Sequence, residues 1–470
     1  MITKQYKLRM TGHQYDALRK HLLTDDGLEA VSVSLCGVAE RQDTGRVERI
    51  VAVHCIEHIP YSECTERTSS RVTWSTKLLS ELIAENSTQQ FVVLKIHSHP
   101  DGSQSFSELD DESDRCLYES LAGWFQRDFV LVSAVMLPGG RIVARAWDGG
   151  ATPVYFESVV VAGDDIYIWN RMNEADPVDE DMDEIQQRTH QTFGQGTTAI
   201  LRKLSVGVVG VSGTGSPLVE MLFRLGVGSL VLVDADTIEK KNLGRIYNSS
   251  RRDIGIYKVD VIARAIKQSG LNTKVLPIHT DLYHTSAIAA LAQCDMVFGC
   301  MDSIVGRDLL NKLAVYYSLP YWDVGVGIEA DGNGGVEFVG VSVHYLTPDG
   351  PTLLERKAYT SEQLRASHLK RTDPEEYEGL LDEGYIQGIR EERPAVISVN
   401  TLAASLAVND FLARIHGFRW FRNADCSAGR FNLSDAYFRY EPAPNVKSSL
   451  APYVGRGDTV PPLGEMNVVQ

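Results

Sequence analysis

The chain has 470 residues, of which 43% are apolar and 23% are charged. This composition is typical of folded globular domains and excludes a disordered chain, a collagen or a coiled-coil rod. At about 100–200 residues per domain, the length predicts two to four domains. The 62 acidic residues against 46 Lys and Arg give a formal net charge of -16, which repels phosphate backbones and anionic lipid. Nucleic acid and membranes are therefore not the expected partners.

No segment has the composition of a signal peptide or a membrane-spanning helix, because no uninterrupted run of about 18 apolar residues occurs. We therefore expect a cytoplasmic protein. The cysteines are scattered and include no C-x-x-C pair, which argues against a disulfide framework or a cysteine-rich zinc ribbon. We expect most of them to be buried thiols. They are Cys36, Cys55, Cys64, Cys116, Cys294, Cys300 and Cys426.

Residues 1–165 alternate strand-like and helix-like patterns, which predicts a mixed α/β domain. The predicted strands lie at 31–39, 49–59, 91–99, 128–137 and 141–147, and the predicted helices lie at 76–85 and 108–125. From 166 to 187 the sequence becomes strongly acidic and loses its periodicity. This change predicts a solvated linker or lid between two domains.

Residues 188–440 predict a doubly wound, Rossmann-like domain with a parallel sheet, because strands and helices follow each other in βαβ order. The predicted strands lie at 205–211, 229–236, 274–280 and 294–302, and the predicted helices lie at 217–226 and 257–270. A charged, irregular stretch at about 347–393 is typical of a crossover insertion, and a helix of small residues is expected at 395–415. Residues 441–470 are expected to form a loose C-terminal tail.

Four polar residues in the segment LKIHSHPDGSQSFSELDD have a spacing that suits a catalytic metal ion. His97 and His99 are two apart on a predicted strand, so both point to one face, about 6.6 Å apart along it. One ion can take both imidazoles, and Asp110 can add an oxygen ligand and leave one tetrahedral position for water, as in catalytic zinc sites. Ser107 would sit beside that water as an oxyanion donor, and it also forms an S-x-x-D helix-start box with Asp110.

This pattern resembles the JAMM (JAB/MPN) zinc isopeptidases, which cut after the C-terminal glycine of ubiquitin and its relatives. The resemblance covers about residues 1–150. It implies an upstream glutamate as general base, on a strand that ends in a small-residue turn, and LEAVSVSLCGV makes Glu29 the candidate. Glu40 is the weaker alternative because it follows that turn. A glutamate of raised pKa would take a proton from the attacking water and pass it to the leaving amine.

The stretch VGVVGVSGTGS places Gly210, Gly213 and Gly215 at a strand-to-helix turn, where backbone N–H groups and the helix N-terminus attract phosphate. The dinucleotide fingerprint G-x-G-x-x-G fails in both registers, because a serine or a leucine stands where one glycine belongs. Asp234 ends the next strand and could hold a ribose in either a dehydrogenase or an ATP-dependent enzyme.

The residues that follow favour ATP over a redox cofactor. DADTIEKKNLGR, Lys258 and MDSIVGR supply cations, an amide and carboxylates, which nucleotidyl transfer needs for phosphates and Mg²⁺ and hydride transfer does not. These stretches resemble the ThiF/ubiquitin-activating family. The resemblance runs from about Arg188 to Gly417 and includes PYWDVGVGI and RPAVISVN.

The resemblance to that family implies a role for each residue of an adenylation site. Gly210, Gly213 and Gly215 would form the phosphate turn. Asp234 would bind the ribose, with Asp236 beside it. The triphosphate would be contacted by Asn242, Arg245 and Lys258, and Mg²⁺ would be held by Asp302. Arg188 corresponds to an arginine that dimeric members extend into the neighbouring subunit's ATP site. A homodimer is therefore implied.

Two features depart from the family pattern. Ser212 stands where the phosphate turn usually has a glycine, and no cysteine lies between Cys300 and Cys426. Neither a thioester-forming cysteine near the crossover nor a zinc-binding C-x-x-C pair is therefore evident. Cys300 ends a predicted strand and is expected in the core, whereas Cys426 has polar neighbours and stays a candidate nucleophile.

Taken together, the two resemblances imply a bifunctional enzyme that adenylates the C-terminal glycine of a ubiquitin-like protein with ATP and cleaves after that glycine with zinc. Such fusions resemble bacterial conjugation or antiphage-defence operons that contain a separate conjugating enzyme. A second hypothesis ends the adenylation in sulfur transfer or direct amide formation, which the missing crossover cysteine favours and the isopeptidase-like domain opposes. A third hypothesis is an inactive scaffold, which the intact metal-site pattern and Glu29 oppose.

Overall fold

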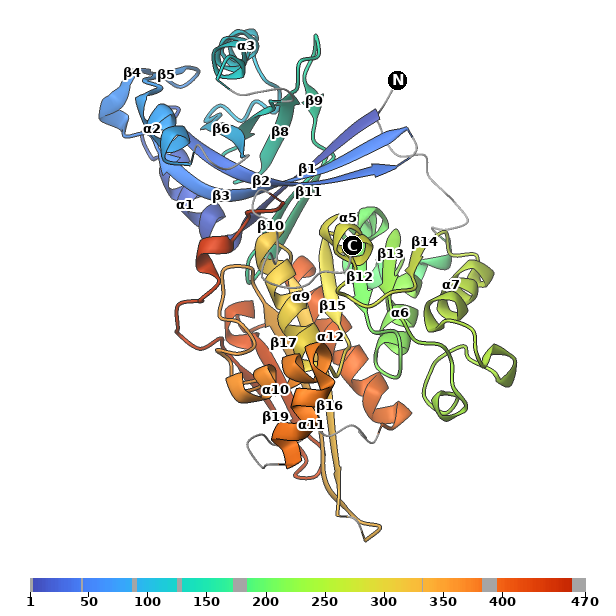
Figure 1. Cartoon of the computed structure of the whole chain (residues 1–470). Helices are drawn as coiled ribbons and strands as arrows, with labels where there is room; N and C mark the ends of the chain where they lie inside the picture. The colour runs from blue at the N-terminus through green and yellow to red at the C-terminus, as the bar shows by residue number, and fades with distance from the viewer. Residues whose placement is uncertain are drawn as a thin grey trace. The chain divides into compact units, whose positions relative to one another are not determined.

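The computed structural model describes residues 3–43, 45–86, 91–124, 129–171, 184–331, 333–382 and 395–458, and it forms two compact units (Figure 1). The first unit contains the described residues up to 171 together with Tyr316–Ser318 and 453–458. The second unit contains the remaining described residues, from 184 to 452. Within these ranges, no helix is both long and apolar enough to cross a membrane.

The first unit is built on a nine-stranded mixed sheet with the strand order β11-β10-β1-β3-β2-β6-β7-β8-β9. Its strands are β1 (Thr3–Thr11), β2 (Val31–Asp43), β3 (Arg46–His58), β6 (Val92–Ser98), β7 (Leu131–Met136), β8 (Ile142–Trp147), β9 (Val154–Tyr155), β10 (Ser158–Ala162) and β11 (Ile166–Asn170). The pairs β1–β3, β1–β10 and β6–β7 are parallel, and the others are antiparallel. The predicted mixed α/β fold is confirmed.

Helices cover both faces of this sheet, because successive strand residues point to opposite sides. Leu94 and Ile96 of β6 share a buried cluster with α1 (Gly12–Leu22), whereas Val93 shares another with α2 (Lys77–Glu85) and α3 (Glu108–Ala122). A separate two-stranded ribbon is formed by β4 (Cys64–Arg67) and β5 (Val72–Trp74). Strand alternation therefore places His97 on the face of β6 that α2 and α3 cover.

Two boundary predictions need correction. The predicted acidic linker at 166–187 begins too early, because β11 pairs with β10 as a strand of the first sheet; residues 172–183 of that linker lie outside the described residues. The predicted loose tail at 441–470 is held to β2 by two backbone hydrogen bonds: the Gly37 N–H donates to the Gly455 carbonyl at 3.0 Å, and the Asp458 N–H donates to the Val38 carbonyl at 2.7 Å; residues 459–470 lie outside the described residues. Backbone hydrogen bonds to β2 override the weak propensity of this glycine-rich segment.

The second unit is built on an eight-stranded sheet with the order β14-β13-β12-β15-β16-β17-β18-β19. Its strands are β12 (Ser205–Val209), β13 (Ser229–Val233), β14 (Lys274–Ile278), β15 (Met296–Gly299), β16 (Tyr321–Ala330), β17 (Val336–Leu346), β18 (Ala428–Asn432) and β19 (Tyr437–Glu441). The five strands from β14 to β16 in this order are parallel, and the last three pair antiparallel. The predicted doubly wound sheet is confirmed, with an antiparallel extension that the sequence analysis did not anticipate.

The helices of this unit follow the predicted βαβ order. They are α5 (Gln187–Lys203), α6 (Gly215–Arg224), α7 (Lys258–Ser269), α8 (Thr285–Ala292), α9 (Ile304–Tyr316), α10 (Ser361–Thr372), α11 (Pro374–Asp382) and α12 (Ile397–His416). The predicted helix of small residues is α12, which packs on α6, β16 and β17. The described part of the predicted insertion contains α10 and α11, and residues 383–393 lie outside the described residues.

The order of the parallel strands reverses at β12, because the chain proceeds from β12 to β13 and β14 on one side and then to β15 and β16 on the other. In open α/β sheets, ligands bind beyond the carboxyl ends of the strands at such a reversal. Gly210 directly follows β12, Asp234 directly follows β13, and Asp302 follows β15 by three residues. Three of the predicted nucleotide-site residues therefore come from the strand ends around this point.

Candidate functional sites

Three predicted metal ligands converge in the first unit. His97 lies on β6, His99 follows it, and Asp110 lies in the first turn of α3. The Nε2 atoms of the two histidines are 3.1 Å apart, and Asp110 places its carboxylate oxygens 3.0 Å from His97 Nε2 and 3.5 Å from His99 Nε2. Two imidazole nitrogens and a carboxylate at this separation form a donor set that suits a divalent zinc ion.

The surroundings prepare these side chains as ligands. His99 Nδ1 lies 2.9 Å from the Ser103 carbonyl. The Nδ1–H group therefore donates to that carbonyl, and the lone pair of Nε2 faces the cluster. Burial lowers the pKa of His97, which keeps its imidazole neutral. At His99, burial is outweighed by hydrogen bonds to Asp110 and to the Ser103 carbonyl, which raise its pKa, so a metal would compete with a proton there. Burial alone would raise the pKa of Asp110, but its contacts with His97, His99 and the Ser107 N–H hold it well below its usual value. Neutral imidazoles and an ionised carboxylate are the forms that bind metals.

Glu29, two residues before the start of β2, joins this cluster. Its carboxylate and the two histidines place ligand atoms within 4.8 Å of one another, and Glu29 is only 5% exposed. Burial raises its pKa to about 7, with the negative charges of Asp110 and Asp101 adding to the effect. Glu40 is instead paired with Arg49 further along β2, with Arg49 Nε 2.5 Å from the carboxylate. Position and burial therefore favour Glu29 as the general base.

Ser107 is the N-cap of α3, as the sequence predicts. The Asp110 N–H donates to Ser107 Oγ, and both the backbone N–H and the hydroxyl of Ser107 donate to Asp110 Oδ2 at 2.7 Å. The helix-start box thereby fixes the carboxylate of the predicted metal ligand Asp110 in place. The predicted oxyanion contact would require the Ser107 hydroxyl to turn away from Asp110.

A buried ion network that the sequence analysis did not anticipate connects α3 with the strands beneath it. Asp114 is fully buried, and its two oxygens lie 2.5 Å from Lys95 Nζ on β6 and 2.6 Å from Arg145 Nη2 on β8. The Arg145 guanidinium also pairs with Asp111 and lies 3.7 Å from the centre of the Phe106 ring. Because Lys95 is two residues from His97 and Asp114 is one turn from Asp110, this network fixes two ligand-bearing elements relative to each other.

In the second unit, the predicted phosphate turn links β12 to α6. Gly210 has φ 84°, and a Cβ on Gly215 would lie only 1.9 Å from the Gly210 carbonyl oxygen. The turn is therefore closed too tightly for side chains at these positions. The Val211 N–H donates to Asp234 Oδ2 at 2.9 Å, so the carboxylate after β13 holds the start of the turn. Such a turn at a helix N-terminus exposes backbone N–H groups to an anion.

Two of the predicted nucleotide-contacting carboxylates lie beside the predicted lysine. Lys258 Nζ, at the start of α7, is 2.6 Å from Asp236 Oδ2 and 3.8 Å from Asp234 Oδ1. The Asp234 carboxylate lies between the phosphate turn and the Lys258 ammonium, and burial raises the pKa of Asp234. These contacts place Asp234, Asp236 and Lys258 together at the end of β13.

The other predicted triphosphate residues lie in and after a short 3₁₀ helix, η2 (Lys240–Asn242). Asn242 is 2% exposed, and its Oδ1 accepts the Glu239 N–H at 2.9 Å. Arg245 N–H donates to the Asn242 carbonyl, and Arg245 Nε is buried without a hydrogen-bond partner among the described residues. Asp302 is exposed in the loop between β15 and α9. An unpaired arginine nitrogen beside a glycine turn is a further sign of an anion site.

Arg188 and Cys426 do not join the phosphate turn in the described structure. Arg188 is exposed on α5 and donates to Gln191 Oε1 at 3.2 Å. Cys426 is 5% exposed in a 3₁₀ turn (Asn423–Cys426), and burial raises the pKa of its thiol. Because reactive cysteines are accessible and have lowered pKa values, this environment argues against Cys426 as a nucleophile. Burial also raises the pKa of the Cys300 thiol, although the residue is only partly buried and does not lie fully in the core as expected.

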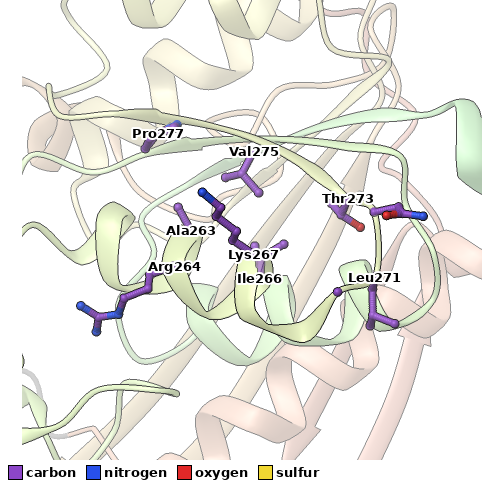
Figure 2. Close-up of a pocket in the computed structure, with 10 residues that line it drawn as sticks. Ala263, Arg264, Ile266, Lys267, Leu271, Thr273, Val275 and Pro277 are labelled. Carbon is purple, nitrogen blue, oxygen red and sulfur yellow. The ribbon is translucent and has the colours of Figure 1, made fainter.

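A pocket of about 600 Å³ lies elsewhere in this unit, between α7 and β14 (Figure 2). Figure 2 shows Ala263, Arg264 and Lys267 lining it from the helix, with Val275 and Pro277 opposite. Its lining contains no carboxylate, histidine or cysteine. None of the candidate site residues lines this pocket.

Known proteins resemble both parts of the chain. "Prokaryotic homologs of the JAB domain" match residues 12–148. Over 120 residues the chain is 34% identical to "Adenylyltransferase and sulfurtransferase MOCS3" of Danio rerio, covering 26% of each chain. Over 151 residues it is 28% identical to "Ubiquitin-like modifier-activating enzyme 5" of Culex quinquefasciatus, covering 30% of this chain and 38% of the relative. The chain thus spans well under half the length of these curated relatives.

A solved structure of Escherichia coli MccB with ATP has 18% sequence identity and a TM-score of 0.42, covering 56% of this chain and 73% of that one. At this TM-score the likeness carries no functional argument. The decisive match is the ThiF family, whose sequence pattern covers residues 186–446, more than half of the chain. The chain therefore belongs to the ThiF family and carries a JAB-like domain before its ThiF domain.

Proposed function

We propose that this protein is a bifunctional enzyme that acts on the C-terminus of a ubiquitin-like protein. Its first unit would cleave the chain after a glycine with the aid of zinc, and its second unit would adenylate the glycine carboxylate with ATP. The observation that carries the proposal is that one chain combines a clustered His, His, Asp and Glu set with a glycine turn bordered by cations. Both reactions act on the same C-terminal glycine of the substrate.

The hydrolytic site would hold zinc through His97, His99 and Asp110. When bound, zinc would supply a Lewis acid that polarises the scissile carbonyl and makes water more acidic. Glu29 would take the proton from the attacking water and deliver it to the nitrogen of the leaving amine. Its raised pKa suits both transfers, because the group must hold the proton only between the two steps.

In the adenylation site, the terminal carboxylate would attack the α-phosphorus of ATP. A carboxylate oxygen forms a bond to the α-phosphorus. The bond between the α-phosphorus and the oxygen that bridges it to the β-phosphate breaks, and pyrophosphate leaves with the electron pair of that bond. Arg245 and Lys258 would balance the growing negative charge, and the N–H groups of the Gly210–Gly215 turn would bind phosphate oxygens. Asp234 would bind the ribose with Asp236 beside it, and Asn242 would contact the triphosphate. Asp302 would supply a protein oxygen to the Mg²⁺ that accompanies ATP.

The fate of the acyl-adenylate has two candidate answers. Conjugation would pass the glycine to a separate conjugating enzyme, as in the bacterial operons that the sequence resembles. The buried, poorly ionised Cys426 favours a second route, in which a sulfur donor or an amine attacks the acyl-adenylate directly without a thioester on this chain. A homodimer in which Arg188 reaches the neighbouring subunit's nucleotide fits either route.

The first test needs no identified partner. Purified protein should contain close to one zinc per chain by inductively coupled plasma mass spectrometry, and it should bind ATP·Mg²⁺ by isothermal titration calorimetry. A panel of ubiquitin-fold proteins that end in glycine, each with and without a short C-terminal extension, then serves as probe. Mass spectrometry should show loss of the extension and release of pyrophosphate with at least one member. Protein that binds neither zinc nor ATP would refute the proposal.

A further inference from the structure

We infer that Asn400 belongs to the nucleotide-binding machinery and donates a hydrogen bond from its side-chain amide to a phosphate oxygen at the Gly210–Gly215 turn. The inference deepens the proposed function, because it rests on ATP binding at this turn. Asn400 lies in the first turn of α12, far along the chain from the glycines, and α12 packs directly against α6, the helix that the turn begins.

The first observation is how closely Asn400 approaches the turn. A Cβ built on Gly213 would lie 2.4 Å from Asn400 Nδ2, and 3.4 Å from Cδ of Arg245. The backbone of Gly213 does not have a positive φ angle, so its conformation does not require glycine. Glycine is required because a Cβ at this position would collide with the Asn400 side chain. The turn at Gly213 is therefore enclosed by the Asn400 amide and the Arg245 side chain.

The second observation is that a donor beside the turn is not used by the protein itself. Asn400 is 3% exposed as a residue, and the Arg245 Nε beside the same turn is buried and lacks a hydrogen-bond partner within the described residues. Leaving a buried polar group unpaired costs about 1–3 kcal/mol. Buried polar groups without partners call for an explanation, and a missing ligand is one.

The chemistry of the enclosed space selects the ligand. Backbone N–H groups of a helix-start turn, a guanidinium and an amide nitrogen are all donors, and a phosphate oxygen can accept from each of them. The Asn400 amide would add a neutral donor to the cationic Arg245, which stabilises the anion without increasing the charge of the site. Because Nδ2 faces Gly213, in the middle of the turn, the predicted contact is to the phosphates and not to the adenosine.

The test compares Asn400→Asp with a matched control on the same helix. Asn409 is exposed on α12, and its amide donates to the Ser405 carbonyl at 2.8 Å, away from the turn. Asn400→Asp keeps the size of the side chain but replaces the donor with a negative charge, so ATP·Mg²⁺ should bind about tenfold or more weakly by calorimetry. Asn409→Asp should bind ATP like the wild type. Asn400→Ser, which only removes the donor, should weaken ATP binding by several fold.

Binding of adenosine, which has no phosphate, separates contact from structural damage. The inference expects Asn400→Asp to weaken ATP binding at least several-fold more than adenosine binding, with an unfolding temperature close to that of Asn409→Asp. Equal ATP binding by wild type and Asn400→Asp would overturn the inference, and so would an equal loss for ATP and adenosine. If the wild type itself binds no ATP, the proposed adenylation site fails, which is a separate result.

Discussion

The Arg67 side chain holds the backbone of Glu29. Arg67 Nε donates to the Glu29 carbonyl at 2.9 Å, and the Glu29 N–H donates to the carbonyl of Thr68 at 2.8 Å. The guanidinium lies 4.1 Å from the centre of the Tyr61 ring and 3.3 Å from the carboxylate of Asp26. The β4–β5 ribbon therefore fixes the peptide that carries the proposed general base.

Arg67→Lys should slow hydrolysis without removing the metal site. Lysine keeps the charge but loses the planar fork that joins the Glu29 carbonyl to the Tyr61 ring. We expect kcat for extension cleavage to fall about tenfold with KM and zinc content nearly unchanged, because misplacement of a general base costs at least this much. Steady-state kinetics on an extended ubiquitin-like probe measures the change.

Arg71→Lys is the matched control for that experiment, because Arg71 is exposed in the same ribbon and pairs only with Glu66 in the described structure. It should behave like the wild type. An unchanged kcat in Arg67→Lys, or an equal loss in both variants, would show that the hydrogen bond to Glu29 does not position the base.

Asp114→Ala should weaken metal binding although Asp114 touches no ligand atom. Its removal leaves Lys95 and Arg145 buried without their shared carboxylate, and breaking a buried pair in this way costs about 3–5 kcal/mol of stability. The loosened α3 should also reduce zinc affinity by about 10–100-fold, as changes behind metal ligands typically do. Competition with a fluorescent zinc chelator measures the affinity.

Glu112→Gln provides the comparison, because Glu112 is exposed on the same helix. It should keep wild-type zinc affinity and stability. Wild-type zinc affinity in folded Asp114→Ala protein would contradict the proposed coupling between the ion network and the ligands.

His344 should make the second unit sensitive to acid. Burial lowers its pKa from 6.5 to about 4, with Asp323 opposing the shift and Arg356, Arg430 and Arg307 adding to it. Because the unfolded chain takes up the proton first, stability is full above about pH 6.5 and decreases as the pH falls toward 4. The loss should be on the order of 3 kcal/mol.

Urea unfolding at several pH values between 4 and 7 tests this expectation. His344→Gln should flatten the dependence, whereas His279→Gln, which changes a half-exposed histidine paired with Asp260, should keep it. A wild-type slope in His344→Gln would rule out this histidine as the source of acid lability.

The two sites should be separable by mutation. His99→Ala or Asp110→Ala should abolish cleavage while sparing ATP–pyrophosphate exchange, and Asp302→Ala should do the reverse, because the residues belong to different units. Both activities are measured on the same preparations. Loss of both reactions in one folded variant would contradict the independence of the sites.

The sequence could predict those features that depend on residues close together in the chain. Ser107 and Asp110 are three residues apart and form a helix cap, and Asp110 also belongs to the proposed metal cluster. One local pattern therefore predicted both the start of the helix and a metal ligand. The βαβ order likewise predicted the parallel sheet and the strand ends that bring Gly210 and Asp234 together.

Features built from distant segments were missed. The buried ion network joins one helix and two strands through Asp114, Lys95 and Arg145. In the sequence alone, nothing distinguishes these three residues from ordinary charged surface residues. Asn400 resembles any polar residue of a helix until tertiary packing brings it to Gly213. The five residues of β11 precede an acidic stretch, so the sequence predicts a linker there, and only pairing with β10 stabilises the strand.

The most direct test of the combined activity uses a ubiquitin-like probe that the wild type processes, prepared with a C-terminal extension and in the form ending in glycine. ATP–pyrophosphate exchange is measured with wild type and with His99→Ala. The account predicts that wild type supports exchange with both forms, because it first exposes the glycine carboxylate, whereas His99→Ala supports exchange only with the form ending in glycine. Equal exchange by His99→Ala on the extended form would contradict sequential use of one peptide end by the two sites.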